Sequence, residues 1–331
     1  MRVTGFLLAL NLTVPLFGGA RPVPIILETD IGDDVDDMYA LVLAARSPQV
    51  DLRAVVTLYG NVALRSALAR KVLLLMGEDQ VPVASGVAQP LDGQTPRNAD
   101  WQGHGVIAAK EKVSGISPLP AVELMAQAVK ASKGRTVIVA VGGLSNSAAL
   151  LEKYPALRGK IARFVIMGGC VRPFVIEGKT YPEKWETNLH HDVKAATIVF
   201  NSGIPITLVP AEVTFKMKLY RTDFARLEQS SSPLAQVIGR ATLDFHAHIV
   251  KILGLDVAAG DSVALLHDPL AVSTLIDPSI STIQPTRIRL ETAPAHIRTI
   301  EDPQGPIPID LVTAADAPRL SRLVTDTVVG P

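Results

Sequence analysis

The sequence contains 331 residues, of which 48% are hydrophobic and 19% are charged, enough apolar material for one large α/β domain or two smaller ones. Lysine plus arginine and aspartate plus glutamate both number 32, so the overall charge offers no attraction to nucleic acid or to a charged membrane surface. The single cysteine, Cys170, excludes an internal disulfide and any cysteine-rich metal site.

The N-terminus, residues 1–20, has the pattern of a secretory signal peptide. Arg2 precedes an apolar stretch over residues 5–17, and the small residues before Arg21 suit cleavage there. We therefore expect a cleaved leader and a secreted or periplasmic mature domain at residues 21–331; an apolar N-terminal extension is the alternative. The stretch is too short for a comfortable transmembrane helix, and we expect no membrane span later in the chain.

An acidic segment follows, between a predicted strand at residues 24–28 and a predicted helix at residues 35–45. The strand is an apolar run rich in isoleucine, and the helix carries apolar residues at helical spacing. Between them, Gly32 allows a sharp turn of the backbone. The segment holds five aspartates within eight residues, namely Asp30, Asp33, Asp34, Asp36 and Asp37.

These carboxylates repel one another unless positive charge offsets them. A helix N-terminus carries only about half a charge, which suits Asp36 and Asp37 as first-turn residues but not Asp30 at the end of the strand. Clustered carboxylates are natural ligands of a hard divalent cation such as Ca²⁺ or Mg²⁺. The spacing does not match an EF-hand loop, because the glycine and glutamate of that motif are missing. The segment predicts a metal site; a solvated acidic loop is the alternative.

Strands and helices then alternate along the chain. The predicted order is a strand at 52–58, a helix at 62–76, a strand at 81–85, a helix at 118–133, a strand at 136–141, a helix at 144–153 and a strand at 164–167. A long polar loop at residues 86–105 interrupts this order. Such alternation predicts an open α/β fold, a mostly parallel Rossmann-like sheet with helices on both faces.

Polar residues and glycine pairs come directly after several of these strands. Asp30 and Asn61 follow the first two, and glycine pairs follow later ones at 142–143 and 168–169. Because parallel sheets bind ligands beyond the carboxyl ends of their strands, we expect these residues to gather at one edge. The glycine pairs suit a phosphate site or tight turns with close packing; the GxGxxG and GxxxxGK[ST] patterns are both missing, which disfavours nucleotide phosphate.

The second half of the chain adds further polar candidates. Residues 170–185 are expected to be irregular and lead to Glu186 and Asn188, an acceptor and an amide suited to binding hydroxyl groups. His190 and His191 suit either a binding site or a solvated surface.

The remaining elements complete the predicted fold. We expect helices at 193–201, 220–229, 234–253, 270–275 and 317–324, a strand at 204–209, and late strands at 280–291 and 307–312 that pair antiparallel. Asp192 is well placed to cap the first of these helices. Asp268 and Pro269 precede the helix at 270–275, and their ordinary interpretation is an N-cap followed by proline at the first helical position.

Taken together, the motifs resemble one enzyme family. In chain order they are ETDIGDDVDD, YGN, VGGLSN, IMGG, ETN and LLHDPLAV, and they resemble the inosine–uridine-preferring nucleoside hydrolases from about residue 24 to the C-terminus. The acidic N-terminal motif combined with the late His-Asp-Pro is a specific pairing. The resemblance implies an open α/β fold, one bound Ca²⁺, and hydrolysis of the N-glycosidic bond of ribonucleosides to ribose and free base.

The resemblance also implies roles for individual residues. It implies a Ca²⁺ site formed by the side chains of Asp30, Asp37 and Asp268 and by the backbone carbonyl of Val141. It implies that the ribose hydroxyls are bound by Asp36, Asn61, Glu186 and Asn188, and that His267 lies near the leaving base.

The chemistry of these residue types fits that reaction. Calcium would lower the pKa of a bound water, whose proton Asp30 would take as general base. Positive charge builds on the ribosyl ring as the bond breaks, and carboxylates such as Glu186 stabilise it. His267 is the titratable group that would protonate or otherwise stabilise the departing base. Direct attack by water predicts inversion at the anomeric carbon.

The sequence departs from the family pattern in places. Glu28 replaces the first aspartate of the usual DxDxxxDD, and two extra residues precede the final pair. We align that pair with Asp36 and Asp37, because the helix starts there; Asp34 is the rival. The histidine segment expected after the third strand is only loosely matched around His104.

Two other functions compete with hydrolysis. A secreted nucleoside- or ribosyl-binding protein of the same fold would keep the metal and lack turnover. A phosphatase with an aspartate nucleophile would need a DxD motif where the sequence has Glu28, Thr29 and Asp30. The family resemblance also suggests a homodimer or homotetramer, and we expect neither nucleic acid nor a membrane as a partner.

Overall fold

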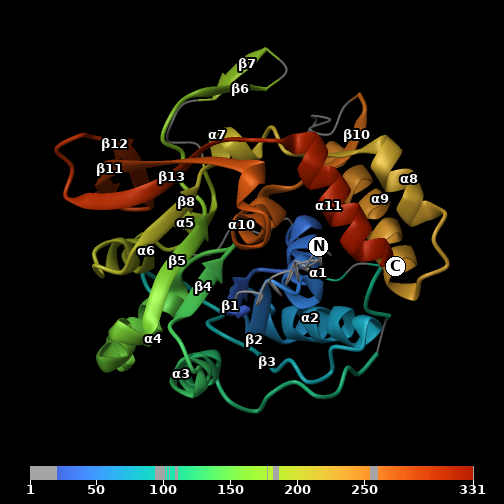
Figure 1. Cartoon of the computed structure of the whole chain (residues 1–331), viewed down its shortest axis with the longest axis horizontal. Helices are drawn as coiled ribbons and strands as arrows, with labels where there is room; N and C mark the ends of the chain where they lie inside the picture. Colours follow the sequence, from blue (N-terminus) through green and yellow to red (C-terminus); the bar gives the residue numbers. More distant parts are fainter. Residues whose placement is uncertain are drawn as a thin grey trace, which may run out of the picture.

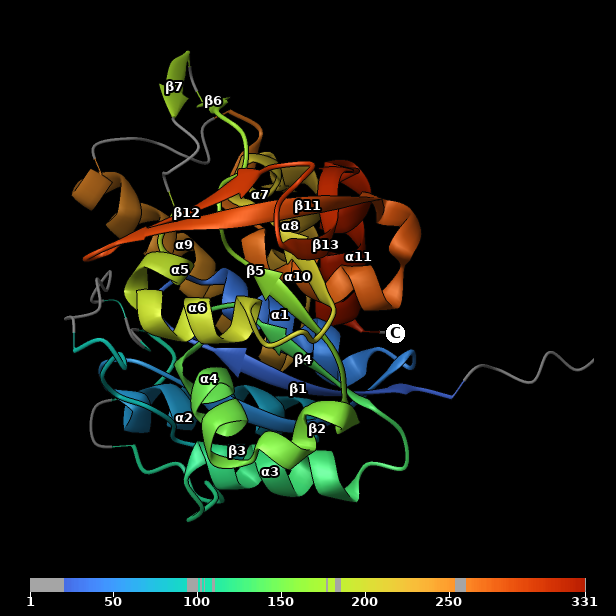
Figure 2. The same cartoon turned by 90° about the vertical axis from the view of Figure 1, so that its left-hand side faces the viewer.

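The computed structural model describes residues 21–93, 101, 103, 105–108, 111–176, 178–181, 186–253 and 260–330. The expected leader, residues 1–20, and His104 lie outside the described residues. One sheet crosses the middle of the molecule, with helices packed on both of its faces (Figures 1 and 2). Within the described ranges, no helix is long and apolar enough to cross a membrane.

The central sheet has nine strands in the order β12-β11-β13-β8-β5-β4-β1-β2-β3. Neighbouring strands are parallel from β3 across to β13, and β11 runs antiparallel to both β13 and β12. The strands are β1 (Val23–Thr29), β2 (Val50–Thr57), β3 (Val83–Ala84), β4 (Thr136–Ala140), β5 (Ile161–Met167), β8 (Ile206–Val209), β11 (Ser281–Ala293), β12 (His296–Glu301) and β13 (Ile307–Ala315). The mostly parallel sheet and the antiparallel pairing of the late strands are confirmed.

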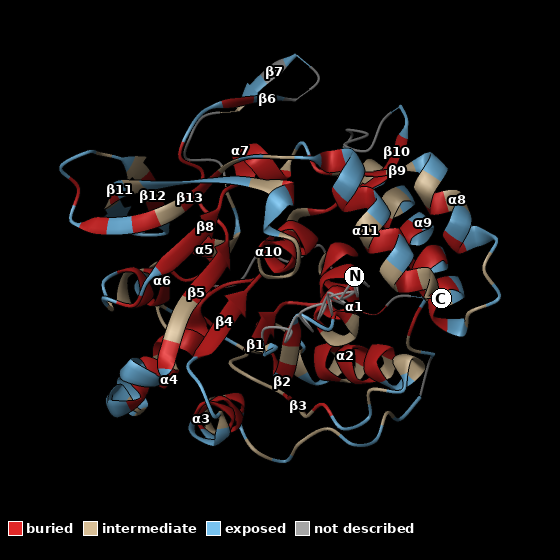
Figure 3. Cartoon of the chain, viewed as in Figure 1, coloured by how far each residue is buried: buried red, intermediate tan, exposed pale blue. Residues whose placement is uncertain are grey.

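Alternate residues of each strand face opposite layers of helices. In β1, Ile25 and Leu27 belong to one hydrophobic core and Ile26 to the other, as the period of two in a strand requires. The first core packs against α1 (Asp36–Arg46), α2 (Val62–Met76), α8 (Arg221–Glu228), α9 (Pro233–Leu253), α10 (His267–Ile276) and α11 (Ala317–Val329). The second packs against α3 (Ala121–Ala131), α4 (Ser145–Lys153) and α6 (Val193–Phe200). The central strands and α1, α2 and α10 are largely buried (Figure 3).

Several short elements were not expected from the sequence. The interval 170–185, expected to be irregular, contains a hairpin of β6 (Phe174–Ile176) and β7 (Lys179–Tyr181) that projects from the body of the protein (Figure 1). The other short elements are α5 (Asn188–His191), α7 (Ala211–Thr214), β9 (Lys218–Tyr220), β10 (Ser262–Leu265) and the 3-10 turns Pro155–Lys160 and Pro278–Ile280. Segments this short span too few residues for a hydrophobic period, so sequence periodicity could not reveal them.

Asp192 joins three parts of the fold. Its Oδ1 accepts the Ala195 N–H at 2.9 Å, which confirms the predicted cap of α6. Its Oδ2 accepts the Ser145 hydroxyl at 2.5 Å and the Leu91 N–H at 2.6 Å. One buried carboxylate therefore fixes the starts of α4 and α6 and the loop after β3.

Replacing Asp192 with alanine should cost more than the loss of a single helix cap. A cap contributes about 1 kcal/mol, and the substitution also removes the acceptor of two further donors, so we expect a total loss of about 2–4 kcal/mol in urea unfolding. The control is Asp316→Ala, because Asp316 is exposed and only caps α11 through the Arg319 N–H at 3.0 Å. Equal losses in the two variants would contradict the joining role of Asp192.

Candidate active site

The loop between β1 and α1 places carboxylates at the carboxyl edge of the sheet. β1 ends at Thr29, and Asp30 follows it directly. Gly32 has a φ of 97°, a left-handed conformation that favours glycine, and this turn leads the chain into α1. Asp36 and Asp37 occupy the first turn of α1, as predicted, where the helix dipole favours negative charge.

Asp36, Asp37 and Asp268 bring three buried carboxylates together. Each offers an oxygen within 4.8 Å of the others, and the residues are 2%, 2% and 4% exposed. The Asp268 N–H donates to Asp36 Oδ2 at 2.9 Å, and the Thr29 hydroxyl donates to Asp37 Oδ1. Helices α1 and α10 therefore direct their N-terminal turns to one point.

The helix that carries Asp268 begins earlier than predicted. α10 starts at His267, so Asp268 is already a helical residue and Pro269 is not at the first helical position. The interpretation of Asp268 as an N-cap is wrong. Its side chain lies with the other buried carboxylates instead of closing the end of its own helix.

Burial and mutual repulsion raise the pKa of all three clustered carboxyls well above the ordinary value of 3.8. Burial is the largest cause; the next is a neighbouring charge, which comes from Asp37 for Asp36, from Asp30 for Asp37 and from Asp36 for Asp268. A divalent cation would supply the compensating charge and bind these hard oxygen ligands. Three buried carboxylates fit a metal site, and they do not fit the alternative of a solvated loop.

Asp30 lies beside this cluster, against the turn after β4. A Cβ added to Gly142 would come within 2.5 Å of Asp30 Oδ1, so glycine is needed to leave room for this carboxylate. Asp30 is not one of the three clustered residues, yet its charge raises the pKa of each of them. Asp34 is half-buried, and its Oδ1 accepts the Asp36 N–H at 3.4 Å. Asp36 and Asp37 thus belong to the buried cluster, and Asp34 does not.

The glycine pair after β4 serves close packing, one of the two interpretations of its sequence. A Cβ on Gly143 would overlap the Tyr59 hydroxyl, which hydrogen-bonds Ser145 at 2.8 Å. His191 packs edge-on against Tyr59 with 5.3 Å between ring centroids and is 5% exposed. The solvated-surface alternative therefore fails for His191.

Asn188 contacts the carbonyl that the family resemblance assigns to the metal. Its Nδ2 donates to the Val141 carbonyl at 2.8 Å and to the Met167 carbonyl at 3.1 Å. The side chain thereby ties the ends of β4 and β5 to the start of α5. Val141 and Asn188 lie at the same sheet edge, as the parallel topology requires.

Glu186 and Asn61 both cap helices at this edge. The two carboxylate oxygens of Glu186 each lie 3.0 Å from the Leu189 N–H, and its side chain is 4% exposed. Asn61 Oδ1 accepts the Leu64 N–H at 3.1 Å at the start of α2, and Asn61 is exposed. Capping uses only part of the hydrogen-bonding capacity of each side chain, so both can also bind hydroxyl groups.

His267 stands in the first turn of α10, next to Asp268. Its Nδ1 lies 2.7 Å from Thr214 Oγ1, and the Phe215 ring packs against it with 4.7 Å between centroids. Burial lowers the pKa of His267 to about 4, so its imidazole is neutral near pH 7. A neutral imidazole offers one N–H donor and one acceptor nitrogen.

Comparison with known proteins decides the family. The family profile described as inosine-uridine preferring nucleoside hydrolase matches residues 25–321. The chain belongs to this family. A pyrimidine-specific ribonucleoside hydrolase, RihA, of Photobacterium profundum is 33% identical over 278 residues, which cover 82% of this chain and 86% of that protein. RihA of Citrobacter koseri is 33% identical over 276 residues, which cover 81% of this chain and 84% of that protein.

Solved structures agree in fold. A plant nucleoside hydrolase, PpNRh1, superposes with a TM-score of 0.80 at 25% identity and covers 94% of this chain and 100% of its own. A purine-preferring ribonucleoside hydrolase from Gardnerella vaginalis gives a TM-score of 0.79 at 24% identity, and the match covers 93% of this chain and 98% of that one. The family resemblance and the α/β fold are confirmed, and the protein is an enzyme, a hydrolase acting on N-glycosyl compounds.

Glu28, the hydrolase's departure from the family's first aspartate, has a structural role. Its carboxylate accepts the N–H groups of Asn146 at 2.9 Å and Ser147 at 3.2 Å, in the first turn of α4. The residue before that helix, Leu144, has no polar side chain for capping. Glu28 therefore caps α4 from β1, and burial raises the pKa of this carboxyl to about 7.

Arg65, on α2, is a buried residue that the sequence analysis did not single out. Its Nε donates to the Tyr59 carbonyl at 2.9 Å, and its Nη1 donates to the carbonyls of Ile31, at 3.1 Å, and Asp30. Tyr59 has a φ of 64°, a left-handed conformation that costs a non-glycine residue about 1–3 kcal/mol. The guanidinium thus fixes the loops before α1 and α2. The available signal was an arginine within a largely apolar helix, which also carries Arg70.

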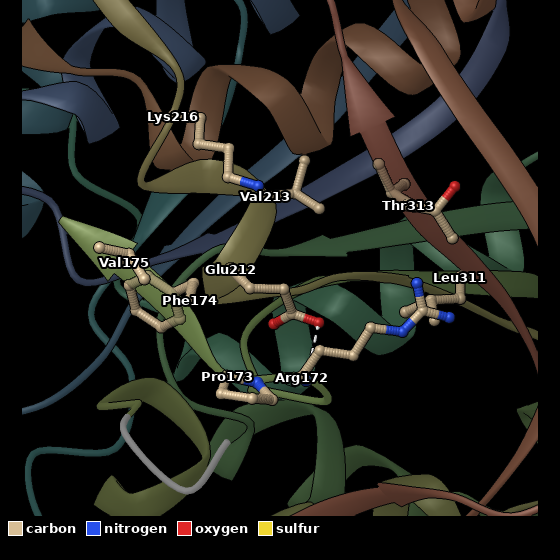
Figure 4. Close-up of a pocket in the computed structure, with 10 residues that line it drawn as sticks. Arg172, Pro173, Phe174, Val175, Glu212, Val213, Lys216, Leu311 and Thr313 are labelled. Carbon is tan, nitrogen blue, oxygen red and sulfur yellow. Dashed lines mark hydrogen bonds between the residues drawn. The ribbon is translucent and has the colours of Figure 1, made fainter. Parts of the chain in front are cut away.

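A cavity of about 410 Å³ lies beside α7 (Figure 4). It is lined by Glu212 and Val213 of α7, by Arg172 and Phe174 before and within β6, and by residues of β13. Its lining contains none of the predicted site residues. The cavity is therefore distinct from the acidic cluster.

Replacing Arg65 with methionine should strongly destabilise the hydrolase. The change removes the guanidinium hydrogen bonds to three loop carbonyls and a positive charge from beside buried carboxylates, so we expect a loss of about 3–5 kcal/mol in urea unfolding. The control is Arg53→Met, because Arg53 is exposed and pairs with Asp51 at 3.2 Å, and exposed pairs contribute about 0–1 kcal/mol. A loss in Arg65→Met no larger than that of the control would refute the role given to the guanidinium.

Proposed function

We propose that this hydrolase cleaves the N-glycosidic bond of ribonucleosides to ribose and free base in a Ca²⁺-dependent reaction. The observation that carries the proposal is the meeting of three buried carboxylates, Asp36, Asp37 and Asp268, beside Asp30 at the carboxyl edge of the sheet. The RihA relatives are named pyrimidine-specific, so uridine and cytidine stand first among the substrates to test.

Four groups are proposed to hold the metal: the side chains of Asp30, Asp37 and Asp268 and the carbonyl of Val141. All are hard oxygen donors, which calcium prefers, and the pKa values of Asp37 and Asp268 are raised by burial and by neighbouring negative charge, which a cation would offset. Asp36 lies within the same cluster and is assigned to the ribose hydroxyls. When bound, the ion would lower the pKa of a water and orient it for attack.

The other catalytic and binding roles are assigned to side chains of the hydrolase itself. Asp30 takes a proton from the attacking water as general base. The ribose hydroxyls are bound by Asp36, Asn61, Glu186 and Asn188. Glu186 also stabilises the positive charge that develops on the ribosyl ring. His267 donates an N–H to the negative charge that develops on the departing base.

We also propose that the hydrolase is exported after removal of residues 1–20. The segment supports export because a basic residue, an apolar stretch and small residues follow one another in the order of a signal peptide. N-terminal sequencing of the protein from expressing cells tests whether the segment is removed. A homodimer or homotetramer stays a prediction, which sedimentation of the purified protein tests.

The central prediction is Ca²⁺-dependent release of ribose by residues 21–331 from uridine, cytidine, inosine or adenosine. Release should stop in EDTA and return with added Ca²⁺. Asp30→Asn should fold normally and lose turnover by at least about 10²-fold, because general base catalysis contributes that much. Retained turnover in Asp30→Asn would refute the assignment of the base. Calcium binding without release from any nucleoside would favour the alternative, a binding protein that lacks turnover.

Calcium should also raise the melting temperature, and more at pH 8 than at pH 5. The raised pKa values of the cluster mean that, without metal, the folded state holds more protons than the unfolded state, so its stability falls as the pH rises above the ordinary value of 3.8. Bound calcium would take the place of those protons. At a thousandfold excess over its Kd, it would stabilise the folded state relative to the unfolded state by about 4 kcal/mol.

The double variant Asp37→Asn with Asp268→Asn should lose this response to calcium. The control is Asp51→Asn, because Asp51 is a surface residue paired with Arg53 and should leave the response unchanged. An unchanged calcium response in the double variant would remove Asp37 and Asp268 from the metal site.

A further inference from the structure

The segment after β8 fixes the position of His267. α7 ends at Thr214, and the Met217 carbonyl accepts the Leu266 N–H at 2.8 Å. β9 then pairs antiparallel with β10, with Lys218 opposite Leu265. The residues just before His267 are therefore bonded to the residues just after Thr214, and the two side chains face each other.

The hydroxyl of Thr214 has two neighbours that can accept its proton. Nδ1 of His267 lies at 2.7 Å, and the Ala211 carbonyl lies at 3.4 Å and already accepts the Phe215 N–H at 3.0 Å. The Ala211 carbonyl is the more distant of the two acceptors and is already occupied, so we take Nδ1 as the acceptor of the Thr214 hydroxyl.

An imidazole that accepts a hydrogen bond at Nδ1 has no proton on that nitrogen and carries its proton on Nε2. We propose that Thr214 is a positioning residue that holds His267 in the Nε2–H tautomer, so that this N–H points to the departing base. The proposal rests on the proposed function, in which His267 serves the base. As the glycosidic bond breaks, its electron pair passes to the base, and the Nε2–H donates a hydrogen bond to the charge that develops there. The opposite tautomer would present a lone pair to that charge.

Aromatic rings fix the direction of the imidazole. The Phe215 ring lies at 79° to the ring of His267, and Phe174 of the projecting hairpin stacks on Phe215 with 5.1 Å between centroids. Tyr181 stacks on Phe174 in turn, at 5.4 Å. With Nδ1 bonded to Thr214 and one side of the ring against Phe215, Nε2 has one defined direction.

The kinetic test compares two leaving groups in Thr214→Val, which keeps the shape of the side chain and removes the hydroxyl. One substrate is the nucleoside that the wild type cleaves fastest, and the other is p-nitrophenyl β-ribofuranoside, whose phenolate leaves without help. Removal of one donor to a developing negative charge costs roughly 10²–10³ in kcat, so we expect a loss of about tenfold or more with the nucleoside. The KM and the activity with the nitrophenyl riboside should change by less than about threefold, because ribose binding and water attack do not involve Thr214.

The spectroscopic test reads the tautomer directly. In ¹⁵N-histidine-labelled wild type, assigned with His267→Gln, the His267 Nδ1 should resonate as an unprotonated nitrogen and Nε2 as a protonated one. Thr214→Val should mix the two tautomers, and Thr214→Ser should restore the wild-type spectrum and nucleoside turnover. The matched control is Thr274→Val, because Thr274 is also buried and bonds a carbonyl of its own helix, Ala271, at 2.7 Å.

The outcomes separate this proposal from the proposed function. A wild-type spectrum with the proton on Nδ1, or equal losses on both substrates in Thr214→Val, would overturn the role of Thr214. Selective loss with the nucleoside, rescued by serine and absent from Thr274→Val, would support it. Failure of the wild type to cleave either riboside would instead overturn the proposed function, and the tautomer measurement would still decide the contact between Thr214 and His267.

Discussion

The buried guanidinium of Arg65 is the constraint on which the site depends. It donates to carbonyls in the loop before α1 and to Tyr59 in the loop before α2, so the backbone that carries the aspartates has one defined path. Its positive charge also acts to lower the pKa of Asp37, against burial and the charge of Asp30, which act to raise it. One cation is too little for a cluster of buried carboxylates. The unbalanced negative charge is the physical reason to expect a metal there.

The parallel sheet turns distant parts of the chain into neighbours. β1, β4 and β5 are adjacent and point the same way, so Asp30, Val141 and Gly168 come out at one edge. Helix starts then supply the polar groups at that edge: Asp36 and Asp37 from α1, and Asp268 from α10. In the opposite layer of helices, Glu28 of β1 caps α4, and Asp192 joins the start of α6 to the start of α4. Buried carboxylates thus have two roles in this fold, as helix caps and as candidate metal ligands. The degree of burial alone does not distinguish the two roles.

The second half of the chain completes the site through short elements. α5 brings Asn188 to the Val141 carbonyl, and the segment from α7 to β9 brings Thr214 to His267. In the proposed reaction, the imidazole of His267 would give the departing base a hydrogen-bond donor without adding a positive charge near the proposed cation. The projecting hairpin also contributes to this part of the site. Its Phe174 stacks on Phe215, and the Phe215 ring packs against His267.

The sequence by itself determined the order and type of the long elements, because hydrophobic periodicity is a local property. The helix at residues 62–76 was predicted with the bounds that the structure has, and the capping role of Asp192 was visible from its position before a helix. The acidic segment and the late His-Asp-Pro also identified the family, since each is a contiguous run of residues.

Only the tertiary structure decided what the individual polar residues do. Asp268 had the local pattern of a helix cap, and its place beside Asp36 depends on how α10 packs against α1, more than two hundred residues away along the chain. Arg65 was one of two arginines in a largely apolar helix, and Thr214 lay in a segment with no periodic signal. Their partners are carbonyls and an imidazole from other parts of the chain. Such contacts are set by long-range packing of the sheet and its helices, which no local pattern of residues contains.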